Sequence, residues 1–138
     1  MLETNLNHNK SFLKILIKKL KEKESRISLF IEPSFKDLEK AKKLGADCVE
    51  IHTGKLCNLI NNKKSYKNEF IKIQKAVTKG NALGLEVHAG HGLTYISAKI
   101  LTKINGIQEF NIGHFLIGES IFEGMPSVIK KFKKILKS

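Results

Sequence analysis

Short apolar segments that alternate with amphipathic segments constrain the fold of this chain more than any other feature. Four segments are short, apolar and rich in strand-forming residues, namely residues 27–31, 48–52, 85–88 and 109–112. Around them, apolar residues recur at helical spacing, with lysines on the opposite faces. Strands that alternate with helices form a parallel sheet with helical crossovers. The sequence therefore predicts a single α/β domain over residues 1–138, with about four parallel strands.

The same periodicity predicts the helices and their buried faces. A helix is expected from Asn9 to about Glu24, after residues 1–8, which carry no pattern. A second helix is expected to begin after Ser34, with Ser34 and Asp37 as a capping-box variant, and to stop at Gly45. Further helices are predicted at about 67–83, 94–103 and 115–122, and the last helix opens at Pro126. The residues expected to face inward are Leu13, Leu16, Ile17, Leu20, Phe35, Leu38, Ala41, Phe70, Ile73, Val77, Ala98, Leu101, Val128, Ile129, Phe132, Ile135 and Leu136.

The segment between the second strand and the third long helix is polar. Residues 55–66 are rich in lysine and asparagine and are expected to form a loop, with room for a helical turn near residues 56–60. The short helix at 115–122 is an extra element, because it precedes the final helix without a strand between them.

The charge of the chain is strongly positive, with a formal net charge of +12. Every basic residue except Arg26 is a lysine, and the lysines are spread over the predicted helix faces. Base reading relies on arginine, and single-strand binding relies on aromatic residues interleaved with charge, so nucleic-acid binding is disfavoured. The positive charge is better interpreted as solvated helix faces that help to attract anionic substrates such as phosphate esters.

The sequence contains no signal peptide and no apolar stretch of about 18 residues, so neither export nor a membrane span is predicted and the cytoplasm is the default compartment. Cys48 and Cys57 have no metal-type spacing and do not make a disulfide framework. Cys48 lies in an apolar run and is expected to be a small buried residue.

Polar residues gather where three of the predicted strands end. The segments are Glu-Ile-His-Thr-Gly at 50–54, His-Ala-Gly-His-Gly at 88–92 and Asn-Ile-Gly-His at 111–114. The carboxyl ends of parallel strands meet at one edge of the sheet, where α/β proteins place their sites. Glu50 and His52 share one strand face and could form an acid/base or electrostatic pair, although a structural role for His52 is equally open.

His88 and His91 have a spacing that could suggest a metal pair. At a strand end this spacing does not place both on one face, and no third ligand lies nearby in the sequence, so no metal site is predicted. His91 lies between Gly90 and Gly92 and is better interpreted as an exposed catalytic or phosphate-contacting imidazole.

Two glycine segments precede predicted helix starts. Gly92 precedes one helix, and Gly113 with His114 precedes the extra short helix. Helix N-termini bind phosphate readily, and eight-stranded α/β barrels use the loops after their last two strands with a short extra helix for this purpose. Each glycine taken singly could equally be a helix-entry turn.

The motifs Ser28-Leu29-Phe30-Ile31, Val49 to Gly54, Ala89 to Tyr95 and Asn111 to Gly118 together closely resemble pyridoxine 5′-phosphate synthase of the deoxyxylulose-dependent vitamin B6 pathway. The resemblance runs from about Leu2 to the C-terminus. It implies a TIM (β/α)8 barrel and a transferase that forms large homo-oligomers. The implied reaction condenses 1-deoxy-D-xylulose 5-phosphate with 3-amino-2-oxopropyl phosphate to pyridoxine 5′-phosphate, phosphate and water, with no metal or organic cofactor.

The same resemblance implies roles for five residues of this sequence. Glu50 resembles the carboxylate that stabilises the transition state, and His91 resembles the proton donor. Gly92, Gly113 and His114 resemble contacts to the amino-oxopropyl phosphate substrate. His88 stands where many relatives are expected to have asparagine.

The motifs of the family's first half, including its general bases, have no counterpart in this sequence. The chain is therefore expected to be the C-terminal half of a TIM barrel, one partial domain that needs a complementary N-terminal half or a homo-oligomer to cover its sheet edges. Little turnover is expected from it alone. The alternatives are a non-catalytic half barrel that binds phosphate or serves assembly and, less favoured, a basic nucleic-acid-binding protein.

Overall fold

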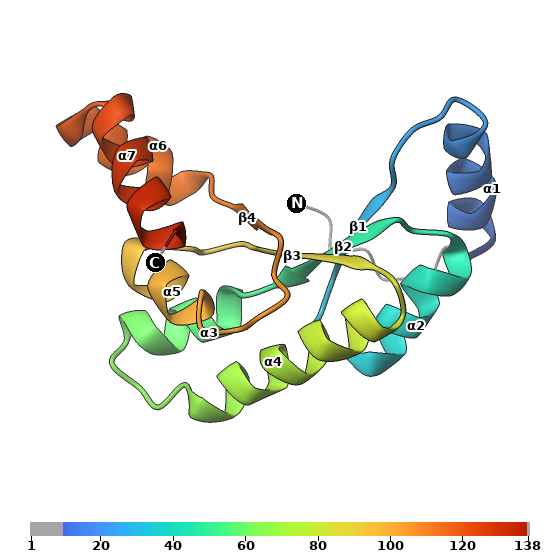
Figure 1. The fold of residues 1–138 in the computed structure, drawn as a ribbon, viewed down its shortest axis with the longest axis horizontal. Helices are drawn as coiled ribbons and strands as arrows, with labels where there is room; N and C mark the ends of the chain where they lie inside the picture. Colours follow the sequence, from blue (N-terminus) through green and yellow to red (C-terminus); the bar gives the residue numbers. More distant parts are fainter. Residues whose placement is uncertain (1–9, 138) are drawn as a thin grey trace.

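The computed structural model describes residues 10–137, and the order of its elements follows the predicted alternation (Figure 1). The described residues form α1 (Lys10–Lys21), β1 (Ser28–Ile31), α2 (Phe35–Leu44), β2 (Cys48–His52), α3 (Gly54–Asn61), α4 (Lys67–Ala82), β3 (Glu86–Gly90), α5 (Tyr95–Leu101), β4 (Glu109–Asn111), α6 (His114–Glu123) and α7 (Met125–Leu136). The sheet has the order β1-β2-β3-β4, and all its neighbours pair in parallel. The predicted fold class is confirmed, while the expectations for residues 1–8 and for Asn9 lie outside the described residues.

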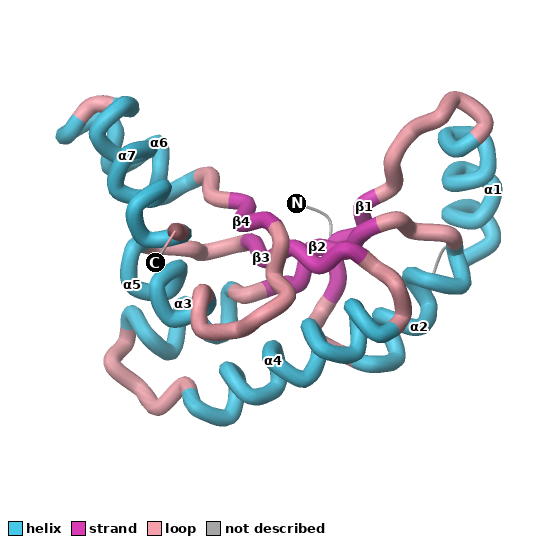
Figure 2. Tube along the Cα trace, viewed as in Figure 1, coloured by secondary structure: helices cyan, strands magenta, loops and turns pink. Residues whose placement is uncertain are grey.

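The sheet has one face covered by helices and one open face. On the covered face, Val49 pairs with Leu29 and Val87, and all three side chains are buried. On the other face, Glu50 pairs with Phe30 and His88. Helices α2, α3, α4 and α5 lie along one side of the sheet, while α1 and the α6–α7 pair stand at its two ends and give the molecule a crescent shape (Figures 1 and 2). The open face therefore lines the hollow of the crescent.

The core lies between the sheet and the covering helices, as the apolar periodicity predicted. Nine of the residues expected to face inward are buried: Ile17, Leu38, Ala41, Ile73, Val77, Ala98, Leu101, Val128 and Phe132. A second, smaller cluster joins Ala98 of α5 to Val128 and Phe132 of α7. Within residues 10–137, none of the helices is long and apolar enough to cross a membrane.

Some of the expected inner residues are exposed, and the prediction was wrong for them. Phe35 is 51% exposed, because it is the first residue of α2 and lies before the turn that packs on the sheet. The other four are at least one third exposed: Leu16, Leu20, Ile129 and Leu136. They belong to α1 and α7, which stand at the ends of the crescent and are covered on one side only (Figure 1).

Two local predictions also need correction. Ser34 occupies the N-cap of α2 in an extended conformation, but its side chain makes no capping hydrogen bond. Residues 54–61 form a complete helix, α3, where a polar loop with a single turn was expected. Its buried residues are Leu56 and Cys57, and their packing stabilises the helix. The polar composition of the segment did not indicate a helix of this length.

We predict that Gly80→Ala destabilises the fold. Gly80 lies in α4 over β3, and a Cβ there would stand 2.7 Å from Val87 Cγ2 and 3.3 Å from Leu38 Cδ2. Overpacking of this kind costs about 1–3 kcal/mol in the free energy of unfolding, measured by urea denaturation. The matched control is Gly118→Ala in α6, where a Cβ meets nothing within 4 Å. Helix propensity should make that variant about 0.5–1 kcal/mol more stable, so equal effects in the two variants would contradict the packing described.

We predict that Asp47 contributes an acid-sensitive part of the stability. Its carboxylate accepts hydrogen bonds from Lys21 Nζ and from the Ile27 amide, each at 2.8 Å. The hydrogen bond from Lys21, followed by that from Ile27, lowers the pKa of Asp47. The contribution is therefore complete above the unfolded-state pKa of about 4 and is lost as the pH falls through the lower folded-state pKa.

The measurement is the free energy of unfolding at about pH 6 and about pH 3, compared with Asp47→Asn. Because the carboxylate is partly exposed, we expect the wild-type chain to lose on the order of 0.5 kcal/mol more than the variant over this range. Parallel pH profiles for the two proteins would contradict the role assigned to Asp47.

Candidate functional site

The carboxyl ends of β2, β3 and β4 meet at an open cavity of about 890 Å³. The residues that line it are Glu50, His91, Gly92, Leu93, Asn111, Ile112, Gly113, His114 and Phe115. All five residues singled out from the sequence are among them, although they come from three separate segments of the chain. The parallel sheet therefore brings together the residues that the strand-end motifs predicted, and their individual roles remain predictions.

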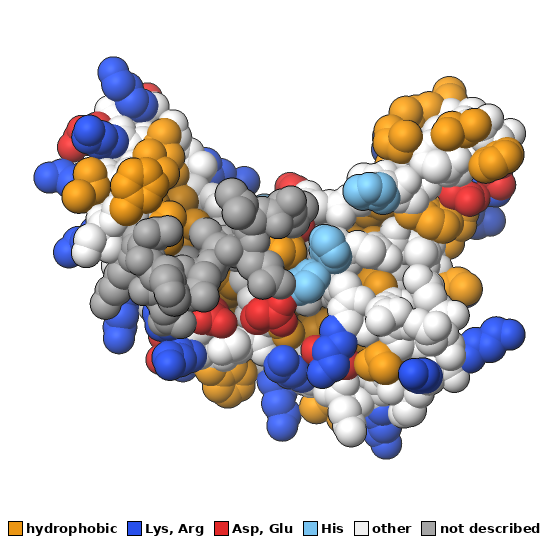
Figure 3. All heavy atoms as spheres, turned by 180° about the vertical axis from the view of Figure 1, so that it is seen from behind, with side chains coloured by type: hydrophobic (Ala, Val, Ile, Leu, Met, Phe, Trp, Pro, Cys, Tyr) orange, Lys and Arg blue, Asp and Glu red, His pale blue; other side chains and the backbone are white. Residues whose placement is uncertain are grey.

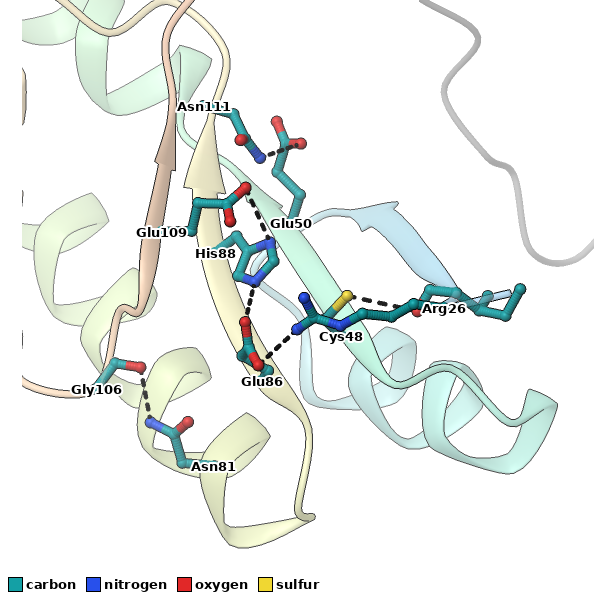
Figure 4. Close-up of polar contacts among 10 residues, drawn as sticks. Arg26, Cys48, Glu50, Asn81, Glu86, His88, Gly106, Glu109 and Asn111 are labelled. Atoms are coloured by element: carbon teal, nitrogen blue, oxygen red, sulfur yellow. Dashed lines mark hydrogen bonds and ion pairs between the residues drawn. The ribbon is translucent and has the colours of Figure 1, made fainter. Parts of the chain in front are cut away.

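The carboxylate of Glu50 reaches from β2 across β3 to β4. Asn111 Nδ2 donates a hydrogen bond to Glu50 Oε2 at 2.8 Å (Figure 4). Between them lies Gly90, where a Cβ would collide with the Glu50 carboxylate and stand 3.1 Å from Asn111 Cβ. Glu50 thus adopts this position because residue 90 has no side chain. Sequence reasoning missed this role of Asn111, because the register that brings β4 beside Gly90 is set in the sheet and has no local signal in the sequence.

His91 lies at the turn after β3, with its side chain exposed. Its backbone φ of 74° is in the left-handed region, and the next residue, Gly92, has a φ of 79°. The His91 ring packs edge-on against the His52 ring, with 4.6 Å between the centroids. His52 Nδ1 lies 2.5 Å from Glu32 Oε1, so His52 connects the end of β1 to the His91 turn. Glu32 was not singled out from the sequence.

The two helix entries at the cavity differ in their capping. At α5, Thr94 Oγ1 accepts a hydrogen bond from the Ser97 amide and Ser97 Oγ accepts one from the Thr94 amide, which forms a capping box. At α6, the N-cap residue is Gly113, which has no side chain with which to cap the helix. The first turn of α6 lines the cavity, and its N–H groups lack the N-cap side-chain bond that Thr94 makes at α5.

The structure gives a steric reason for glycine at position 92. Its positive φ suits glycine, and a Cβ there would stand 3.2 Å from Cys57 Cβ in α3. Gly92 therefore lets the His91 turn lie close to α3. It belongs to this turn and is not the N-cap of α5, which is Thr94.

His88 belongs to a different cluster from His91. It is buried on the open sheet face, its Nε2 lies 2.8 Å from Glu86 Oε1, and its Nδ1 lies 3.8 Å from Glu109 Oε1 (Figure 4). Arg26 pairs with Glu86, and that hydrogen bond, followed by the one with His88, lowers the pKa of Glu86. His88 does not line the cavity, so its contacts are those of a structural residue.

The histidines, cysteines and carboxylates of the described residues do not gather into a metal site. Between residues 10 and 137, no three such side chains group as metal ligands would. His88 contacts two carboxylates, whereas the His91 ring contacts His52, so the two histidines with metal-like spacing have separate partners.

Comparison with known proteins identifies the family of the chain. Residues 3–138 match the family model described as pyridoxal phosphate biosynthesis protein PdxJ. Proteins named pyridoxine 5′-phosphate synthase are similar to the chain, from Pelagibacter ubique at 54% identity over 95% of this chain and 55% of the relative, and from Rhodospirillum rubrum at 45% identity over 86% and 47%. The relative of that name from Bdellovibrio bacteriovorus is 40% identical over 98% of this chain and 56% of its own length. The chain spans about half the length of the curated relatives it matches. It belongs to the PdxJ family of pyridoxal phosphate biosynthesis proteins.

Proposed function

We propose that the chain supplies the C-terminal half of the active site of a pyridoxine 5′-phosphate synthase. The substrates would be 1-deoxy-D-xylulose 5-phosphate and 3-amino-2-oxopropyl phosphate, and the products pyridoxine 5′-phosphate, phosphate and water. The observation that carries the proposal is the cavity in which Glu50, His91, Gly92, Gly113 and His114 come together from three strand ends. Vitamin B6 biosynthesis is the function of the family to which the chain belongs.

His91 would donate the proton that a leaving oxygen requires. Loss of water needs a positioned acid, and a histidine can hold and release a proton near neutral pH. His91 is suited to this role because its side chain is exposed and lines the cavity.

Glu50 would stabilise positive charge that develops in the ring-forming intermediates. Its carboxylate lies at the cavity wall and is held there by Asn111, so little reorganisation is needed when charge appears. A preorganised charge in a partly buried site stabilises a transition state more than the same charge in water does.

The phosphate of the amino-oxopropyl substrate would bind at the start of α6. Gly113, the N-cap residue, has no side chain to bond the first N–H groups of that helix, and His114 is the first helical residue. Anions bind such helix ends, and the net charge of +12 would attract the phosphorylated substrates over a longer distance. Gly92 also lines the cavity and, having no side chain, would let its backbone approach the substrate closely.

A complementary half barrel, from another chain or within a homo-oligomer, would complete the fold. Within the described sheet, β1 and β4 each have one pairing edge without a neighbour. Hydrophobic side chains gather over the two ends of the crescent in Figure 3. They include Phe12 of α1 and Ile117, Ile121 and Phe122 of α6, which are 54–87% exposed.

The cytoplasm is the compartment we propose, because both cysteines are free thiols in the structure.

Complementation between two halves tests the proposal directly. The chain is purified alone and mixed with the N-terminal half of the Pelagibacter ubique relative, and pyridoxine 5′-phosphate formation is measured. We expect little or no product from either half and product from the mixture, because catalytic groups that act as a unit are strongly non-additive. Full activity of the chain alone would contradict the need for a partner. No recovery would leave phosphate binding without catalysis as the function.

In an active mixture, we predict that His91→Gln lowers kcat by about 10²–10⁴-fold and that Glu50→Gln lowers it by about 10²–10³-fold, because one removes the acid and the other the stabilising charge. The control is His88→Asn, outside the cavity, which should change kcat by less than about threefold. Near wild-type kcat for His91→Gln would rule out His91 as the proton donor.

A further inference from the structure

The backbone of His91 is held in a conformation that a histidine rarely adopts. Its φ is 74°, a left-handed value that residues with a Cβ occupy only when the surroundings enforce it. A strained residue at the edge of a cavity calls for contacts that hold it in place. The segment between β2 and α3 supplies them.

Thr53 is the backbone contact. It is fully buried, and its Oγ1 lies 2.8 Å from the carbonyl oxygen of Gly90 and 2.9 Å from that of His91, so its one hydroxyl proton is shared between the two. The Thr53 amide also donates to the Gly90 carbonyl at 2.9 Å, which extends the β2–β3 ladder by one bond. Cys57 Sγ lies 3.7 Å from the His91 carbonyl oxygen. Thr53 thus contacts the carbonyl groups immediately before and after the Cα of His91.

His52 is the nearer of two ring contacts of His91, since the Phe30 ring lies at 6.2 Å between centroids. Its ring meets the His91 ring edge-on at 4.6 Å, and its Nδ1 is fixed by the carboxylate of Glu32 at 2.5 Å. Gly54 leaves room for this pair, because a Cβ there would lie 2.7 Å from His52 Nε2 and 2.8 Å from His91 Cδ2. The rings therefore meet in a space that any side chain at position 54 would occupy.

We propose that His52 and Thr53 are the positioning residues of His91. Thr53 fixes the backbone of the strained turn, and the His52 ring, itself oriented by Glu32, fixes the direction of the imidazole toward the cavity. The proposal rests on the proposed function in one respect, that the His91 imidazole acts on a bound substrate. Its structural content, that these contacts set the conformation of His91, does not depend on that function.

The test on the chain alone is NMR of histidine side chains labelled with ¹³C and ¹⁵N, with His91 assigned by comparison with His91→Gln. We expect Thr53→Val, which keeps the shape and removes the hydroxyl, to shift or broaden the His91 ring signals and to leave those of His88 unchanged. Thr53→Ser retains the hydroxyl and should restore the wild-type signals. Unchanged His91 signals in a folded Thr53→Val chain would overturn the backbone part of the proposal.

A second variant covers the case in which Thr53→Val does not fold, since Thr53 is buried. Gly54→Ala leaves the Thr53 hydroxyl in place and inserts a methyl group between the two rings. We expect it to move the signals of both His52 and His91, and unchanged signals would overturn the ring part of the proposal.

The kinetics of the complemented enzyme test whether the positioning of His91 matters for catalysis. Thr53→Val should lower kcat about tenfold or more with little change in KM, and Thr53→Ser should stay within about threefold of wild type, because misplacing a reacting group affects the chemical step. If the wild-type mixture is inactive, the proposed function fails while the NMR result still decides the positioning role. A Thr53→Val enzyme with displaced His91 signals and unchanged kcat would overturn the link to catalysis.

Discussion

The parallel pairing of β2 with β3 is the interaction on which the rest of the site depends. In this register Glu50 lies beside His88, and His52 lies beside Gly90. The glycine is then placed where the Glu50 carboxylate crosses toward Asn111 of β4. One more hydrogen bond of the same ladder, from the Thr53 amide to the Gly90 carbonyl, ties the end of β2 to the turn that carries His91. A slip of one residue would turn each of these side chains to the covered face of the sheet.

The polar side chains of the open sheet face form two groups. In the first group, Arg26 pairs with Glu86, and the His88 ring contacts the carboxylates of Glu86 and Glu109. Glu50 is the register partner of His88, but its carboxylate crosses Gly90 toward Asn111. Toward the carboxyl ends, Glu50, His91 and the first turn of α6 face the cavity. The residues of the first group therefore contact one another, whereas those of the second group line the cavity. The covered face, with Leu29, Val49 and Val87, supplies the apolar burial that holds the sheet to its helices.

Much of the fold could be predicted from the sequence because its signals are local. The limits of β2 agree with the predicted strand to the residue, and α4 agrees within one residue of its predicted end. The failures in burial and at α3 have a common cause, since each depended on neighbours that are distant in the chain, whereas the missing cap at Ser34 is local. Phe35 and Leu16 have the periodicity of buried residues but stay exposed beside the elements of residues 10–137, and α3 is stabilised by the burial of Leu56 and Cys57 rather than by its composition.

For the candidate site, the sequence by itself determined which residue types stand at the strand ends, because a parallel α/β pattern places those ends at one edge. Glu50, His91, Gly92, Gly113 and His114 could be named on that basis. Only the tertiary structure decided which of them touch and what holds them. Asn111 became the partner of Glu50, and Thr53 and His52 the partners of His91, through the sheet register and the turn after β3. Contacts between segments up to 61 residues apart depend on strand alignment in space, which no local pattern records.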